Sequence, residues 1–109
     1  MRDESYGPLT SAWAALNDKA AERDATSIRS LFDADPDRSN RFNLEAAGLF
    51  LDFGRQRLDE GTLALLYELA EQTGVRAGID RMFAGEHINN TEDRAALHVA
   101  LRRPADRPL

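Results

Sequence analysis

The sequence predicts a mainly α-helical protein that carries one small two-stranded antiparallel hairpin. In several short segments, separated by glycine, proline or polar residues, apolar residues recur at helical spacing. Two short runs on either side of Gly48 alternate between apolar and other residues, which is typical of strands joined by a tight turn. Because a two-stranded hairpin is too small to dominate a fold, the several short helices set the fold class.

Composition excludes several classes of function. The chain has 109 residues, 42% of them hydrophobic, which is enough for one modest core. A net charge of −5 argues against a general nucleic-acid or anionic-membrane binder. The absence of cysteine excludes disulfides and thiolate metal sites, and two histidines leave little material for a histidine-rich metal site. Without an apolar leader or a membrane-spanning run, we expect a soluble, cytoplasmic protein.

The first helix is expected to begin at Thr10 or Ser11, either of which can cap it. The preceding residues, 1–9, are mostly polar and predict a flexible N-terminal arm. The buried stripe of this helix is expected to contain Trp13, Leu16 and Ala20. As the only tryptophan, Trp13 is interpreted as a core anchor and not as a ligand-stacking residue.

A shorter second helix is expected to begin at Thr26 or Ser27, either of which can cap it. Asp35-Pro36 ends it, because a residue before proline avoids the helical conformation. Aspartates alternate through this region as in a calcium loop, but the glycine and the distal glutamate of an EF-hand are not at the required spacing. We therefore predict no metal site here.

The hairpin is predicted near residues 42–53, with its turn around Gly48. The alternating apolar positions are Phe42, Leu44, Ala46, Leu49, Leu51 and Phe53. Glu45 and Asp52 could be imagined as a pair of catalytic carboxylates, but no pocket-forming residues accompany them. We interpret both as charges on the solvent side of the strands.

Two helices are predicted to follow the hairpin. Asp59 caps the longest helix, roughly Glu60–Thr73, and Gly74 closes it. The next helix runs from Val75 to Phe83 and ends at Gly85, where glycine can adopt a left-handed conformation without steric cost.

A last helix is predicted from Thr91 to Arg102, after a polar crossing in which Asn90 or Thr91 provides the cap. This segment is apolar on most sides, which is typical of a helix inside a larger structure. Three cationic side chains at spacing i, i+4, i+8 would share one side of it: Arg94, His98 and Arg102. Residues 103–109, with two prolines and no periodicity, read as a truncated linker.

The stretch from Met82 to Arg102, MFAGEHINNTEDRAALHVALR, resembles a segment of the glucose-6-phosphate isomerase family with the form MF-x-GEKIN-x-TE-x-R-x-VLHVALR. The positions that fall on this pattern are Met82, Phe83, Gly85, Glu86, Ile88, Asn89, Thr91, Glu92, Arg94 and all of 97–102. His87 departs from it, standing where the family usually has lysine, and Ala96 replaces a valine.

The resemblance implies the N-terminal segment of an enzyme that interconverts glucose 6-phosphate and fructose 6-phosphate in glycolysis and gluconeogenesis. Family members continue into two αβα sugar-isomerase domains, which supply a glutamate base, a histidine for ring opening and a phosphate cradle. We therefore expect no catalytic, cofactor-binding or metal residue in this chain, and no cofactor. Arg94, His98 and Arg102 could face a sugar phosphate, or equally bind carboxylates and carbonyls of neighbouring segments. The second, structural role is the leading interpretation.

The resemblance also implies partners: the remainder of the isomerase chain, a second subunit in a homodimer, and a sugar phosphate bound to the whole enzyme. Neither nucleic acid nor membrane is expected as a partner. Two other hypotheses remain open. The chain could be a stand-alone helical protein-interaction module derived from the isomerase N-terminus, or a small acidic regulatory protein that resembles the family by descent only.

Overall fold

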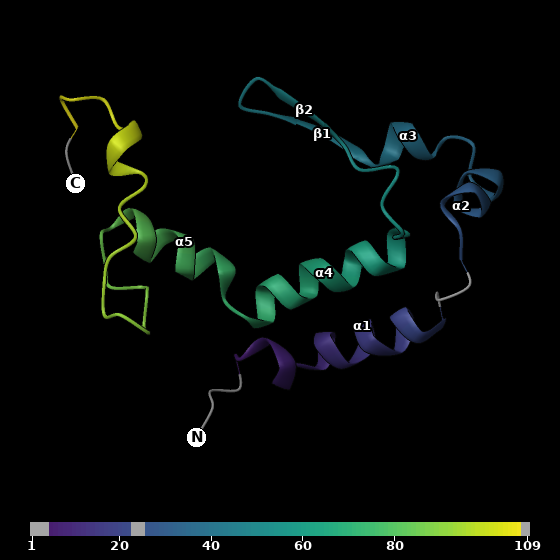
Figure 1. Ribbon diagram of the computed structural model, residues 1–109, viewed down its shortest axis with the longest axis horizontal. Helices are drawn as coiled ribbons and strands as arrows, with labels where there is room; N and C mark the ends of the chain where they lie inside the picture. The colour runs from purple at the N-terminus through teal and green to yellow at the C-terminus, as the bar shows by residue number, and fades with distance from the viewer. Residues whose placement is uncertain (1–4, 23–25, 108–109) are drawn as a thin grey trace.

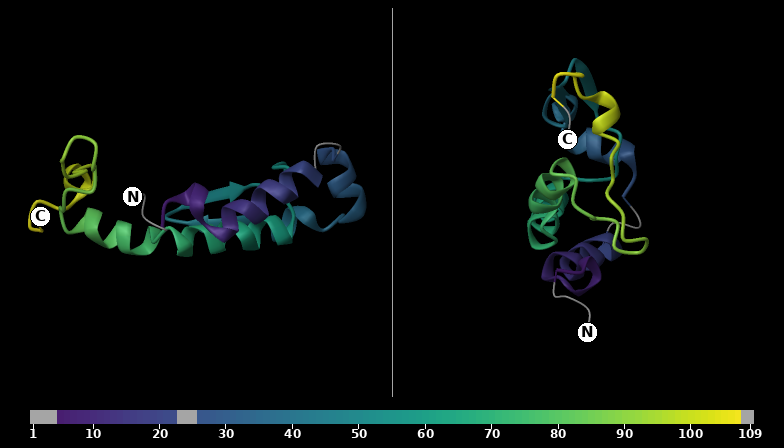
Figure 2. Two further views of the ribbon diagram at one scale, coloured as in Figure 1. Left: turned by 90° about the horizontal axis from the view of Figure 1, so that it is seen from below. Right: turned by 90° about the vertical axis from the view of Figure 1, so that its left-hand side faces the viewer.

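The computed structural model describes residues 5–22 and 26–107, and among them it is mainly helical with one antiparallel hairpin, as predicted. Figures 1 and 2 show a flat, open arrangement with extents of 51 × 41 × 18 Å. The elements are η1 (Gly7–Leu9), α1 (Ser11–Glu22), α2 (Ile28–Ala34), α3 (Arg38–Arg41), β1 (Asn43–Ala46), β2 (Leu49–Asp52), α4 (Glu60–Gln72), α5 (Val75–Phe83) and η2 (Ala100–Arg102).

Of the arm expected over residues 1–9, residues 1–4 lie outside the described part, and Gly7–Leu9 form the short 3₁₀ helix η1. Of the linker expected over 103–109, residues 103–107 have no regular structure beyond a turn, and residues 108–109 lie outside the described part.

Side-chain caps begin three of the helices where the sequence predicts them. The Thr10 hydroxyl accepts a hydrogen bond from the Trp13 N–H at the start of α1 (3.2 Å). The Ser27 hydroxyl accepts from the Ser30 N–H at the start of α2 (3.0 Å). Asp59 accepts from the Thr62 N–H at the start of α4 (2.7 Å). Each cap satisfies a backbone donor that the helix itself leaves without a partner.

Helices α1 and α4 lie antiparallel and side by side, as Figure 1 shows. At one end, the Gln72 side chain accepts a hydrogen bond from the Ala12 N–H (3.1 Å) and donates one to the Ser11 hydroxyl (2.9 Å). At the other end, Lys19 and Asp59 form an ion pair (3.6 Å). Polar contacts therefore fix both ends of the helix pair.

Glycines end α4 and α5, as predicted. Gly74 has a left-handed backbone (φ +69°) and joins the two helices directly. At the end of α5, the Gly85 N–H bonds the Met82 carbonyl (3.1 Å) and the Glu86 N–H bonds the Arg81 carbonyl (3.1 Å). With Gly85 at φ +77°, these two bonds make a Schellman motif.

The hairpin has the predicted position and turn. Leu44 pairs with Leu51 and Ala46 with Leu49, and Ala47 and Gly48 both take positive φ values at the turn. Two consecutive left-handed residues match the twist of the flanking strands. At its base, the Phe42 and Phe53 rings meet edge to face with centroids 5.8 Å apart.

The predicted helix from Thr91 to Arg102 is wrong. The segment forms turns, an isolated bridge between Asn89 and Arg94, and only the short η2 at its end. Asp93 has φ +52°, a left-handed conformation that interrupts any helix. The apolar residues of the segment predicted a buried helix, but local backbone hydrogen bonds give it a conformation made mostly of turns.

The expected role of Trp13 as a core anchor is also wrong, because its side chain is 40% exposed. Leu66, which faces it from α4, is 41% exposed. Within the described residues, the buried side chains are Ala12, Phe42, Thr10 and Arg38. The chain exposes 8639 Å², whereas a compact monomer of this mass exposes about 6,000 Å². Its radius of gyration is 18.1 Å, against about 13 Å for a compact domain.

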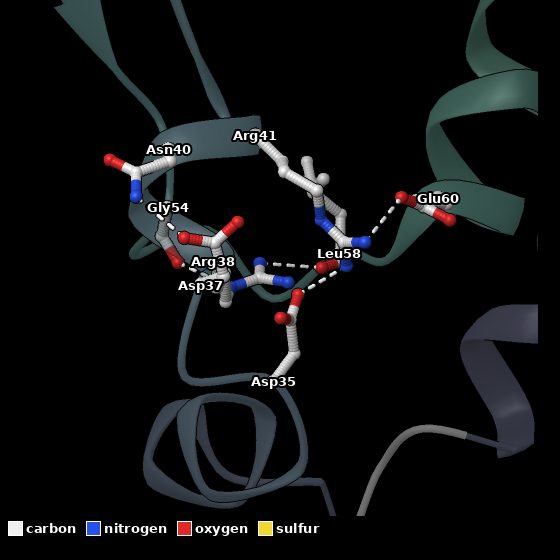
Figure 3. Close-up of polar contacts among 8 residues, drawn as sticks. All are labelled: Asp35, Asp37, Arg38, Asn40, Arg41, Gly54, Leu58 and Glu60. Carbon is white, nitrogen blue, oxygen red and sulfur yellow. Dashed lines mark hydrogen bonds and ion pairs between the residues drawn. The ribbon is translucent and has the colours of Figure 1, made fainter.

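Arg38, on α3, is the largest buried polar side chain in the described part (2% exposed). Figure 3 shows its guanidinium among backbone carbonyls of the loop between β2 and α4. It donates hydrogen bonds to the carbonyls of Gly54 (2.7 Å), Gln56 (2.8 Å) and Leu58 (2.5 Å). Its charge also lies 4.2 Å from the centre of the Phe42 ring. Arg38 thus connects α3, the hairpin base and the start of α4.

We expect Phe42→Ala to lower the free energy of unfolding by about 3–5 kcal/mol, because the ring is fully buried. Leu66→Ala should cost less than about 2 kcal/mol, since much of that side chain already contacts water. Urea denaturation of the two variants measures the difference. Equal losses would contradict the assignment of the core to the hairpin base.

We expect Arg38→Met to lower the free energy of unfolding by about 2–4 kcal/mol, because three carbonyls lose a charged donor. Arg41→Met is the matched control. Arg41 pairs with Asp35 and Glu60 but is 48% exposed, so its loss should cost less than about 1 kcal/mol. Unfolding midpoints of both variants test this, and an unchanged midpoint for Arg38→Met would refute the proposed anchor.

Candidate functional site

Arg94, His98 and Arg102 do not line up along a helix, because the helix that would align them does not form. Arg94 takes part in the isolated bridge with Asn89, His98 lies in irregular backbone, and Arg102 lies in η2. All three side chains are exposed. The Arg102 guanidinium donates to the His98 carbonyl (3.0 Å), a local contact within the segment. The role of the three residues stays a prediction.

A tight loop over residues 86–94 is organised by the Asn89 side chain. Its amide oxygen accepts hydrogen bonds from the Thr91 hydroxyl (2.8 Å) and the Thr91 N–H (3.3 Å). Two backbone bonds between Asn89 and Arg94 (3.0 and 3.2 Å) close the loop. His87 contacts Asp93 across it (3.0 Å), so its acidic neighbour in space is not the adjacent Glu86. These contacts give the segment a defined shape.

A groove of about 480 Å³ lies between α1 and α4. Its walls are largely apolar, and its lining residues are Trp13, Leu16, Asn17, Lys19, Ala20, Arg57, Thr62, Leu66 and Leu69. Lys19 already pairs with Asp59, and the Arg57 Nε–H donates to the Thr26 carbonyl (3.0 Å). The groove therefore offers apolar surface, and its lining contains no carboxylate or histidine that could act as a base.

A second hollow of about 400 Å³ lies beside α3 and is strongly charged. Arg41 lines it and pairs with two carboxylates, those of Asp35 and, at 3.2 Å, Glu60 (Figure 3). Because Arg41 is shared by two carboxylates, we interpret the hollow as the site of a structural ion-pair network.

Glu45 and Asp52, rejected as a catalytic pair, do not act together in the structure. The Asp52 carboxylate accepts a hydrogen bond from the Gly54 N–H (2.8 Å), and Glu45 lies opposite Phe50 in the hairpin. In the described residues, no group of three or more potential metal-ligating side chains comes together. No helix within that same part is long and apolar enough to cross a membrane.

Arg38 and α3 are the features that sequence reasoning missed. A four-residue helix is too short to show periodicity, and an arginine beside Asp37 and Ser39 resembles surface sequence. One signal was available. The turn-rich stretch before Asp59 is expected to contain several backbone carbonyls without partners, and such carbonyls need a hydrogen-bond donor.

Comparison with known proteins now gives the relationship. A family model described as phosphoglucose isomerase matches residues 52–109. The glucose-6-phosphate isomerase of Deinococcus radiodurans is 54% identical over 95 residues, covering 87% of this chain and 18% of the relative. Those of Chromobacterium violaceum and Rhodococcus opacus are 50% identical over 98 residues and 47% over 100, covering 90% and 92% of this chain and 18% of each relative. The chain spans about a fifth of the length of these relatives, and it belongs to the phosphoglucose isomerase family.

Proposed function

We propose that this chain is the N-terminal segment of a glucose-6-phosphate isomerase and that it contributes structure, not catalytic groups, to the enzyme. The observation that carries the proposal is the 54% identity over 95 residues to a relative of which the chain covers 18%. In this proposal residues 10–102 form the segment and residues 103–109 lead to the remainder of the enzyme. The cytoplasm is the compartment expected for such an enzyme.

The described surface supports a non-catalytic role. Isomerisation between an aldose and a ketose needs a base at the reacting carbons and a cradle that positions the phosphate. Correct orientation alone can supply about 7–11 kcal/mol of barrier lowering. The carboxylates of Glu86 and Glu92 are exposed on a loop, and neither lines one of the two hollows beside the helices. In the described part of the chain, neither carboxylate is therefore placed to act as a base on a sugar phosphate held in either hollow.

The partners of the chain follow from the same proposal. The first is the remainder of the isomerase, and through it a second subunit and the sugar phosphate. The large exposed apolar surface also suits the alternative of a stand-alone interaction module. The two functions differ in whether the segment can replace its counterpart in an active isomerase.

We expect the isolated chain not to interconvert glucose 6-phosphate and fructose 6-phosphate in a coupled assay. A chimera, in which this chain replaces the matching region of the Deinococcus radiodurans isomerase, should keep activity within about tenfold of the parent enzyme, because the catalytic groups stay in place. The parent enzyme is the control.

Two results would contradict the proposal. A folded chimera without activity would favour the interaction module. Turnover by the isolated chain that Glu86→Gln abolishes would place a catalytic base in this segment.

A further inference from the structure

The hairpin presents an apolar face that the described residues leave open. Residues paired across the two strands point to the same side, so one face carries Leu44, Ala46, Leu49 and Leu51, here called the leucine face. Leu49 is 72% exposed and Leu51 is 54% exposed. The opposite face carries Asn43, Glu45 and Asp52 together with one apolar residue, Phe50. The hairpin is therefore amphipathic, with its apolar side toward water.

The leucine face has a fixed direction, because the base of the hairpin is anchored. The Phe53 N–H donates to the Phe42 carbonyl (2.9 Å), and the Asn43 side chain donates to the Ser39 carbonyl (2.6 Å). Arg38 donates a hydrogen bond to the Gly54 carbonyl in the loop that follows β2. Figure 1 shows the two strands projecting from α3, away from the α1–α4 pair. A two-stranded hairpin is marginally stable in water unless its apolar face packs on something.

The surface area that the chain leaves exposed indicates how large a body would be needed to cover it. The exposed area is roughly 2,600 Å² larger than that of a compact monomer of the same mass. A standard interface buries only about 800 Å² per partner, so one such contact with a second copy would leave most of the excess in water. The Deinococcus relative, of which the chain covers 18%, contains a far larger body that could bury it.

We propose that the leucine face is the surface on which the remainder of the isomerase packs, with Leu49 and Leu51 inserted into its apolar surface. This inference rests on the proposed function and names the contact that the segment makes within it. Phe50 and the polar face stay outside this contact.

Cysteine labelling tests the contact, since this chain contains no cysteine. Leu51→Cys is the test variant, and Phe50→Cys, on the opposite face of the same strand, is the matched control. In the isolated chain both should react with a thiol reagent at similar rates, because Leu51 and Phe50 are 54% and 64% exposed. In the chimera, Leu51→Cys should react at least about tenfold more slowly, and Phe50→Cys within about twofold of its rate in the isolated chain. The unsubstituted chimera gives the background from cysteines of the relative.

The outcomes separate the two proposals. Equal labelling of the two variants in an active chimera would overturn the docking surface and leave the proposed function intact. A folded, inactive chimera in which only Leu51→Cys is protected would support the docking surface and contradict the proposed function. Protection of Leu51→Cys in the isolated chain that grows with concentration would show that a second copy covers the face, and would overturn the inference. A chimera that does not fold would contradict both. Circular dichroism of the isolated variants checks that neither substitution unfolds the chain.

Discussion

The guanidinium of Arg38 joins parts of the chain that no regular hydrogen-bond ladder connects. Its donors reach carbonyls of Gly54, Gln56 and Leu58, so the whole loop between the hairpin and α4 wraps around one side chain. Because Asp59, the cap of α4, follows Leu58 directly, the same contacts set where the longest helix begins. A lysine would donate all its hydrogen bonds from one nitrogen, whereas Arg38 donates from two, Nε and Nη2, held in one plane. The direction of the hairpin and the position of α4 therefore depend on the planar, charged guanidinium group of Arg38.

This polar anchor has particular importance because the described residues bury so little apolar surface. Although 42% of the chain is hydrophobic, Ala12 and Phe42 are the apolar side chains that the described part buries. A body of 109 residues normally offsets its conformational entropy with a core of many such side chains. Here helices are fixed by caps, glycine stops and ion pairs, and most apolar stripes stay partly exposed. Local structure is thus specified more completely than tertiary packing.

That division explains which features the sequence could predict. The caps at Thr10, Ser27 and Asp59 and the stops at Gly74 and Gly85 act within a few residues, so each is visible in the sequence around it. The hairpin was predictable for the same reason. The exposure of Trp13 was not predictable in this way, because it depends on how much of the chain covers α1 and α4. Arg38 was missed because its carbonyl partners lie 16 to 20 residues away.

The segment from 91 to 102 shows why apolar content alone does not fix a conformation. Its residues suit burial, yet the Asn89 side chain and the bridge to Arg94 turn the chain back before a helix can start. Nucleating a helix fixes several residues for one hydrogen bond, so a competing local turn wins easily in a short segment. The absence of this helix in the structure also affects the candidate site. Spacing of four residues aligns side chains on a helix, and without one the spacing of Arg94, His98 and Arg102 no longer places them on one side. A cationic surface for a sugar phosphate was inferred from that alignment alone, so it loses its geometric basis here, and the role of the three residues stays a prediction.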